Sequence, residues 1–281
     1  MKKIPQKIVH NYLRHDKKFP HVWCPGCSNG IVLGAIIRAI EEMQLDKDNV
    51  TMVSGIGCSS RMPVYIDLNT LHTLHGRAIA FATGIKMYKP DMKVMVVTGD
   101  GDSSAIGGNH LIHAARRNID ITVVVVNNNI YGMTGGQYSP TTPQGSYATT
   151  MQYGNIDTPF DICELVMGAG ATFVARTTAY HAIEAETLIK KGMEHKGFSL
   201  IDIISACPTY YGRFNKNADP SAMMVEMKEQ AVPIKVFEKL SPEERIGKYP
   251  RGILKETDRM EYTDAYAKLA NSFQKEEEGE K

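Results

Sequence analysis

The feature that most constrains the fold is a series of short apolar segments in which hydrophobic residues do not alternate with polar ones. Such segments are typical of parallel strands that are covered on both faces. We expect strands at residues 50–54, 93–98, 121–126 and 199–205. Apolar residues at helical spacing predict helices at residues 31–43, 77–87, 106–117 and 180–195. Strands separated by helices predict an α/β fold with a doubly wound, mostly parallel sheet.

Each predicted strand runs into a cluster of glycine, asparagine or cysteine. The clusters lie at residues 55–58, 99–102, 127–136 and 205–208. Because ligands of such sheets bind outside the carboxyl ends of the strands, we expect one composite site. We assign it to a domain formed by residues 1–207. The pattern is irregular after that, and we expect 208–281 to be a C-terminal extension that packs on the domain or on a partner subunit.

Composition excludes several classes of partner. The chain has 281 residues and a formal net charge of +1, so nothing indicates binding to nucleic acid or to a membrane surface. No apolar run approaches the roughly 18 residues of a membrane span. The first seven residues lack the apolar segment of a signal peptide. We therefore expect a soluble, cytoplasmic protein.

Two polar clusters at neighbouring strand ends predict a site for a divalent cation and a phosphate group. Gly99-Asp100-Gly101-Asp102 ends one strand, and Asn127-Asn128 ends the next. A carboxylate, a side-chain amide and a backbone carbonyl just after the asparagines can supply the oxygen ligands that Mg²⁺ prefers. The glycines let backbone N–H groups approach a diphosphate closely. An ordinary turn with a polar loop is the alternative for either cluster alone.

Four of the five cysteines are expected to meet at the same sheet edge. Cys24 and Cys27 form a C-x-x-C pair, Cys58 ends a glycine-rich turn, and Cys207 follows a strand. An odd cysteine count argues against a disulfide framework. Four thiolates suit a zinc ion or an iron–sulfur cluster equally well on chemistry alone, and a redox dithiol is also open. We expect the fifth, Cys163, to be a buried core thiol.

These motifs resemble those of a known family. The Gly-Asp-Gly to Asn-Asn arrangement resembles the thiamine-diphosphate motif, and N-x-x-Y-G-M-T-G-G-Q over residues 128–137 resembles the matching loop of 2-oxoacid:ferredoxin oxidoreductase β subunits. The resemblance implies that thiamine diphosphate and Mg²⁺ are bound. The implied magnesium ligands are Asp100, Asn128 and Ile130. The residues implied to lie at the cofactor are Ile56, Gly57, Cys58, Ser59, His75, Gly101, Asp102, Gly132 and Met133.

The same resemblance implies a [4Fe–4S] cluster held by Cys24, Cys27, Cys58 and Cys207. It also places His75 on the cofactor side, where we assign it a catalytic role. Arg61 is our candidate for the substrate carboxylate, because a guanidinium makes paired hydrogen bonds to carboxylates. An ordinary surface arginine is the alternative for Arg61, and a structural histidine is the alternative for His75.

The function that follows from the resemblance is oxidative decarboxylation of a 2-oxoacid, which we expect to be 2-oxoglutarate. In this family the acyl group passes to coenzyme A and the electrons pass to ferredoxin. The sequence offers no second domain for the cofactor's pyrimidine, so an α subunit is the implied partner, and small ferredoxin-like subunits can accompany it. The alternatives are a sister enzyme for pyruvate or branched-chain 2-oxoacids, and a zinc-stapled, non-catalytic subunit.

Overall fold

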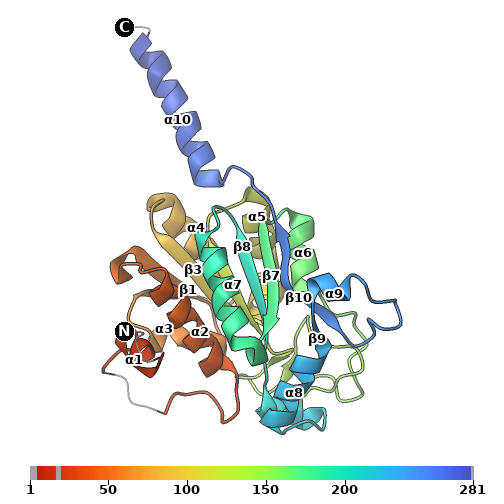
Figure 1. Cartoon of the computed structure of the whole chain (residues 1–281). Helices are drawn as coiled ribbons and strands as arrows, with labels where there is room; N and C mark the ends of the chain where they lie inside the picture. Colours follow the sequence, from red (N-terminus) through yellow and green to blue (C-terminus); the bar gives the residue numbers. More distant parts are fainter. Residues whose placement is uncertain (1–4, 17–19, 280–281) are drawn as a thin grey trace.

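The chain folds around one eight-stranded sheet in the computed structural model, which describes residues 5–16 and 20–279. The prediction that the chain has no signal peptide concerned the first seven residues. Of these, residues 1–4 lie outside the described residues. Figure 1 shows the sheet between two layers of helices. From one edge to the other, the strands are β2 (Asn69–His72), β1 (Val50–Ser54), β3 (Lys93–Gly99), β4 (Thr122–Asn127), β8 (Ser199–Ile204), β7 (Phe173–Thr178), β10 (Tyr249–Glu256) and β9 (Ala231–Pro233).

The first six strands of this order are parallel to one another. This arrangement confirms the predicted α/β class. β10 runs antiparallel to β7, and β9 pairs with β10. Residue 207 is therefore not a break in the sheet. The region after residue 208 thus contributes two strands to the sheet of the domain.

Helices cover both faces of the sheet because residues within each strand point alternately to opposite sides. In β4, Val124 and Val126 belong to one apolar core, whereas Val123 and Val125 belong to the other. The first core contains residues of α1 (Pro5–Asn11), α2 (Asn29–Glu42), α3 (Met62–Tyr65) and α7 (Ala182–Glu194). The second contains residues of α4 (Ala78–Tyr88), α5 (Gly108–Arg117) and α6 (Ile162–Ala169).

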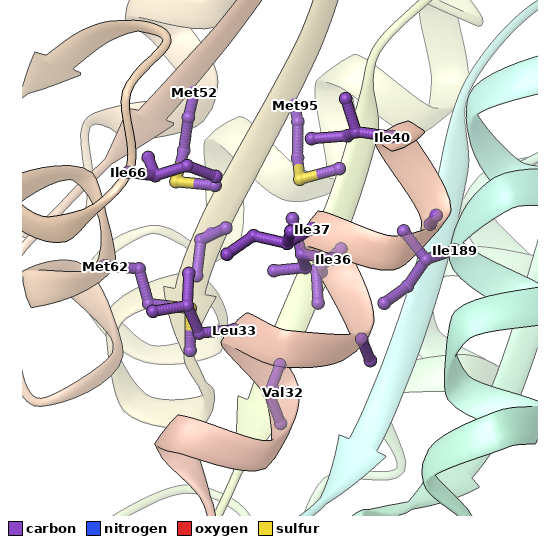
Figure 2. Packing of buried hydrophobic residues seen from close by; sticks show 14 of the residues in the cluster. Val32, Leu33, Ile36, Ile37, Ile40, Met52, Met62, Ile66, Met95 and Ile189 are labelled. Carbon is purple, nitrogen blue, oxygen red and sulfur yellow. The ribbon is translucent and has the colours of Figure 1, made fainter. Parts of the chain in front are cut away.

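Helix α2 is the centre of the first core. Its apolar residues recur at helical spacing, and Figure 2 shows them against methionines of β1 and β3 and against Ile189 of α7. Ile36, Ile37 and Ile40 are completely buried. Full burial of such a side chain contributes about 1.5–3 kcal/mol. This packing fixes the start of α2, and with it Cys27 and Asn29, against the sheet edge where the predicted site lies.

Local pattern predicted most of the parallel strands to within one residue at either end. It missed β2 and β7. β2 is a partly exposed edge strand with the mostly polar sequence NTLH. β7, with the sequence FVARTT, mixes polar and apolar residues, including a buried arginine, and shows no clear hydrophobic period. The helix predicted at 106–117 begins as α5 at Gly108, after a wider π-type turn, η3 (Asp102–Ile106), which follows the Gly-Asp-Gly sequence.

The remaining elements are short, apart from two helices near the C-terminus. Helix α8 (Pro220–Gln230) packs near the end of β8, and α10 (Tyr262–Gly279) extends away from the sheet in Figure 1. Over the described ranges, none of the helices is long and apolar enough to span a bilayer. The other short elements are η1 (Lys47–Asn49), η2 (Ser59–Arg61), η4 (Ala179–His181), η5 (Pro208–Gly212), α9 (Ile234–Phe237) and the hairpin β5 (Ile130–Tyr131) with β6 (Gln137–Tyr138).

Candidate active site

The turns that follow β1, β3 and β4 enclose one cavity, which we call the cofactor cavity. These strands are neighbours in the sheet, so their carboxyl ends lie side by side. The cavity brings together every residue predicted to lie at the cofactor or to bind magnesium. Its lining includes Ile56, Gly57, Cys58, Ser59, His75, Asp100, Gly101, Asp102, Asn128, Ile130, Gly132 and Met133.

Three oxygen-bearing groups converge in this cavity. One of the two terminal atoms of the Asn128 side-chain amide lies 3.3 Å from Asp100 Oδ1 and 2.7 Å from the carbonyl oxygen of Ile130. With the amide nitrogen in that position, Asn128 donates to both oxygens; with the amide oxygen there, the three oxygens can share a cation between them. Magnesium binds oxygens at 2.0–2.1 Å, which separates neighbouring ligands of an octahedron by about 2.9 Å. The two separations from Asn128 are close to that spacing, so the three groups are suited to bind Mg²⁺.

Asp100 is held in place by side chains that the sequence did not reveal. Its Oδ2 accepts hydrogen bonds from Ser139 Oγ at 2.5 Å and Thr141 Oγ1 at 2.7 Å. Both donors lie in the long loop after β6, and both are buried. Burial raises the pKa of the Asp100 carboxyl, and these hydrogen bonds oppose that effect. A carboxylate that is costly to bury alone is suited to bind a cation.

Asp102 joins three segments of the site. Its Oδ1 accepts hydrogen bonds from His75 Nδ1 at 2.5 Å, from Gly76 N at 2.7 Å and from Ile56 N at 3.3 Å. Its Oδ2 accepts one from Thr98 Oγ1 at 2.7 Å. We predicted that Asp102 would line the diphosphate. It does line the cavity, but its carboxylate is fully used in holding these turns together.

The contact with Asp102 fixes the orientation of His75. With Nδ1 hydrogen-bonded to a carboxylate, the ring donates at Nδ1, and Nε2 is left to act at the cavity. The ring of Tyr131 packs edge-on against it, with centroids 6.0 Å apart, and the Tyr131 hydroxyl donates to the carbonyl of Gly101. His75 is therefore a held, partly exposed imidazole at the cavity wall.

The four predicted cluster cysteines line a second cavity, which we call the sulfur cavity: Cys24, Cys27, Cys58 and Cys207. Cys163 lies elsewhere, completely buried between α6 and β7, as predicted for a core thiol. Burial raises the pKa of the thiols of Cys27 and Cys207, and raises that of Cys58 to about 12. The negative charge that each thiolate would present to the others adds to this rise. Such thiols ionise readily only when a metal binds them.

The four cysteines, all in the described part of the chain, surround one cavity without forming a compact single-ion site. Among the residues that the structure describes, no three His, Cys, Asp or Glu side chains are grouped closely enough to hold a single metal ion. Four thiolates on zinc would have to lie about 3.8 Å apart, given Zn–S bonds of about 2.3 Å. A Cβ at Gly132 would lie 3.4 Å from Cys207 Sγ and 3.7 Å from Cys58 Sγ. Gly132 thus lets the backbone approach both sulfurs.

Backbone amides point at three of the four sulfurs. Met133 N–H donates to Cys58, the N–H groups of Tyr210 and Tyr211 donate to Cys207, and Asn29 N–H donates to Cys27. Hydrogen bonds of this kind to cluster sulfurs help to set the reduction potential of an iron–sulfur site. The donor set is therefore consistent with a redox cluster.

The two cavities share a wall. Cys58, Asn128, Gly132 and Met133 line both. Arg61 lines neither. It ends η2, three residues after Cys58, and its side chain is exposed, so its proposed contact with substrate stays a prediction.

Comparisons with known proteins identify the family. Residues 55–203 match the model of the thiamine pyrophosphate enzyme C-terminal, TPP-binding domain. The chain is 50% identical to the 2-oxoglutarate synthase subunit KorB of Methanocaldococcus jannaschii, over 94% of this chain and 98% of the relative. It is 53% identical to the subunit of the same name from Methanothermobacter marburgensis, over 90% of this chain and 88% of the relative.

The chain belongs to the KorB family. This confirms the resemblance to 2-oxoacid:ferredoxin oxidoreductase subunits, and the family domain confirms a thiamine-diphosphate-binding fold. A solved structure is also similar: the 2-oxoglutarate:ferredoxin oxidoreductase from Magnetococcus marinus with 2-oxoglutarate, coenzyme A and succinyl-CoA bound. Its TM-score is 0.85 at 36% identity, and the alignment covers 98% of this chain and 92% of that one. The matched TPP-binding domain, residues 55–203, contains the cofactor-cavity turns after β1, β3 and β4.

Proposed function

We propose that this chain is the β subunit of a cytoplasmic 2-oxoglutarate:ferredoxin oxidoreductase. In the proposed reaction, 2-oxoglutarate and coenzyme A give succinyl-CoA, CO₂, a proton and two electrons, and the electrons pass through a [4Fe–4S] cluster to ferredoxin. The relatives named as 2-oxoglutarate synthase subunits support this choice of substrate over pyruvate and branched-chain 2-oxoacids.

The single observation that carries the proposal is the shared wall. Cys58 and Met133 line both the cofactor cavity and the sulfur cavity, together with Asn128 and Gly132. A redox centre held by Cys58 would thus be separated from the cofactor only by the residues of this shared wall. An electron-rich group in one cavity could be oxidised one electron at a time by a cluster in the other.

In this proposal, Asp100, Asn128 and the carbonyl of Ile130 would hold Mg²⁺, which would supply positive charge for the diphosphate. Thiamine diphosphate, when bound, supplies a carbon nucleophile and an electron sink for decarboxylation. His75 is oriented by Asp102 so that Nε2 can hold or release a proton at the cavity. Gly101 leaves the backbone N–H of the turn free to approach the diphosphate.

The proposed cluster ligands are Cys24, Cys27, Cys58 and Cys207. All four line one cavity, and the similarity to a 2-oxoglutarate:ferredoxin oxidoreductase supports an electron-carrying iron–sulfur cluster over a zinc ion. We therefore do not retain a zinc-stapled, non-catalytic subunit as a second candidate.

An α subunit is part of the proposal because the described sheet forms only the diphosphate half of a cofactor site. The glutamate that activates the pyrimidine would come from that partner, so this chain alone should be inactive. Arg61 remains our candidate for the distal carboxylate of 2-oxoglutarate. An Arg61→Lys variant that raises KM for 2-oxoglutarate but not for 2-oxobutyrate, which has no distal carboxylate, would support this role.

The experiment that tests the proposed function uses the purified α–β complex, prepared without oxygen. Its visible absorption is followed after addition of 2-oxoglutarate and coenzyme A. We expect iron in the complex and bleaching of the cluster absorption with 2-oxoglutarate. Bleaching only with pyruvate would refute the substrate assignment, and a complex that contains zinc without iron would refute the redox function.

A further inference from the structure

Asn29 lies between the two cavities and makes contacts that no motif predicted. It is the first residue of α2, and its side chain is 1% exposed. Its Nδ2 donates a hydrogen bond to Cys27 Sγ at 3.1 Å. The residue also lines the cofactor cavity. Its Oδ1 is buried and has no hydrogen-bond partner within the described part of the chain.

The Asn29 side chain differs from the other donors to these sulfurs. Cys58 and Cys207 receive hydrogen bonds from backbone N–H groups, which a substitution of the donor residue leaves in place. Cys27 receives a backbone N–H as well, but also the amide of Asn29. Within the described ranges, Asn29 is thus the one side chain that donates to the sulfur of a predicted cluster ligand, and so the one sulfur donor that a substitution removes.

We propose that Asn29 is a positioning residue with two contacts. Its amide nitrogen raises the reduction potential of the cluster through the hydrogen bond to Cys27, and its amide oxygen accepts a hydrogen bond from a group bound in the cofactor cavity. The inference rests on the proposed function, because it requires a cluster at these cysteines. Reduction adds negative charge that is shared by the thiolate ligands. A hydrogen bond donated to one of them stabilises the reduced cluster more than the oxidised cluster, and so raises the potential.

The unpartnered oxygen gives the second half of the inference. A buried acceptor without a donor is unfavourable, so a group that enters the adjoining cavity and donates to it binds more tightly. Thiamine diphosphate carries an N–H donor of this kind, the amino group of its pyrimidine. If the bound cofactor presents that amino group to the cavity wall, Asn29 Oδ1 would accept a hydrogen bond from it while Nδ2 donates to Cys27.

The first test is a redox titration of the cluster in the purified α–β complex, followed by its spectrum. Asn29→Ala removes the donor, whereas Asn29→Asp keeps the shape but presents an oxygen to the sulfur. We expect the equilibrium constant for one-electron reduction to fall about tenfold in Asn29→Ala, which is about 59 mV. Asn29→Asp should lower it further. Ile31→Ala, with an exposed side chain that lines neither cavity, is the control and should leave the potential unchanged.

The outcomes separate this inference from the proposed function. A wild-type complex without iron would refute both. If both variants bind iron and keep the wild-type potential, the role of Asn29 is refuted and the proposed function stands. The role of Asn29 is also refuted if Asn29→Ala shifts the potential but Asn29→Asp does not, because that pattern indicates an effect of packing.

The second test measures cofactor affinity. Asn29→Ala should weaken binding of thiamine diphosphate about tenfold, but should not change binding of an analogue that lacks the pyrimidine amino group. An equal loss for both compounds would overturn the assignment of the oxygen.

Discussion

Replacing Gly55 with alanine tests whether Asp102 holds the site together. Gly55 follows β1, and its backbone packs directly on the Asp102 carboxylate. A Cβ at residue 55 would lie 2.1 Å from Asp102 Oδ2 and 2.7 Å from its Cγ. Atoms cannot approach so closely, so either the carboxylate or the turn must move. Asp102 is 3% exposed and accepts four hydrogen bonds, so it has no open space to enter.

The magnitude follows from these contacts. Overpacking of a buried site costs about 1–3 kcal/mol. Loss of one hydrogen bond to a carboxylate adds about 1.5–3 kcal/mol. We therefore expect Gly55→Ala to lower the free energy of unfolding by about 2.5–6 kcal/mol. Because the displaced carboxylate also releases His75, affinity for thiamine diphosphate should fall in any variant that still folds.

Gly84→Ala provides the matched control. Gly84 lies within α4, is exposed, and has no atom within 4 Å of the position where its Cβ would be. The same substitution should stabilise the helix there by up to about 1 kcal/mol. Both variants are compared by urea denaturation and by titration with thiamine diphosphate and Mg²⁺. A loss below about 1 kcal/mol for Gly55→Ala, with unchanged cofactor affinity, would show that the Asp102 contacts do not organise the site.

Three further predictions concern the metal centres and pH. Cys24→Ser should lower the iron content of the complex, whereas Cys163→Ser should leave iron per chain unchanged; equal losses would contradict the ligand assignment. Asp100→Asn should weaken Mg²⁺-dependent binding of thiamine diphosphate at least 100-fold, measured by calorimetry, without destabilising the metal-free chain, because burial raises the pKa of this carboxyl and makes its charge costly there. Burial lowers the pKa of His195 below its usual 6.5, so the unfolded chain binds a proton at this residue more readily than the folded chain. Protonation of His195 therefore lowers the free energy of unfolding as the pH falls below about 6.5. His195→Gln should therefore flatten the decline of the unfolding free energy from pH 7 to pH 5 in urea denaturation, and an unchanged decline would count against it.

The sequence by itself determined the parallel sheet and the identity of the groups at its edge. Uninterrupted Val and Ile runs specify buried parallel strands through local pattern alone. Because the carboxyl ends of parallel strands meet at one edge, the order of the motifs along the chain was enough to bring Asp100, Asn128 and Cys58 together. The glycine at 132 was likewise visible as part of a motif, although its closeness to two sulfurs was not.

Tertiary structure decided the contacts between segments that are distant in sequence. Ser139 and Thr141 hold Asp100 across about forty residues, and Asp102 is bonded to both the 55–58 turn and His75. Asn29 lines the cofactor cavity because α2 is packed against β1 and β3. The pairing of β10 with β7, which places the C-terminal region on the sheet, is of the same kind. Hydrogen-bond partners of a buried carboxylate or amide depend on which surfaces pack together, and local sequence pattern carries no record of that packing.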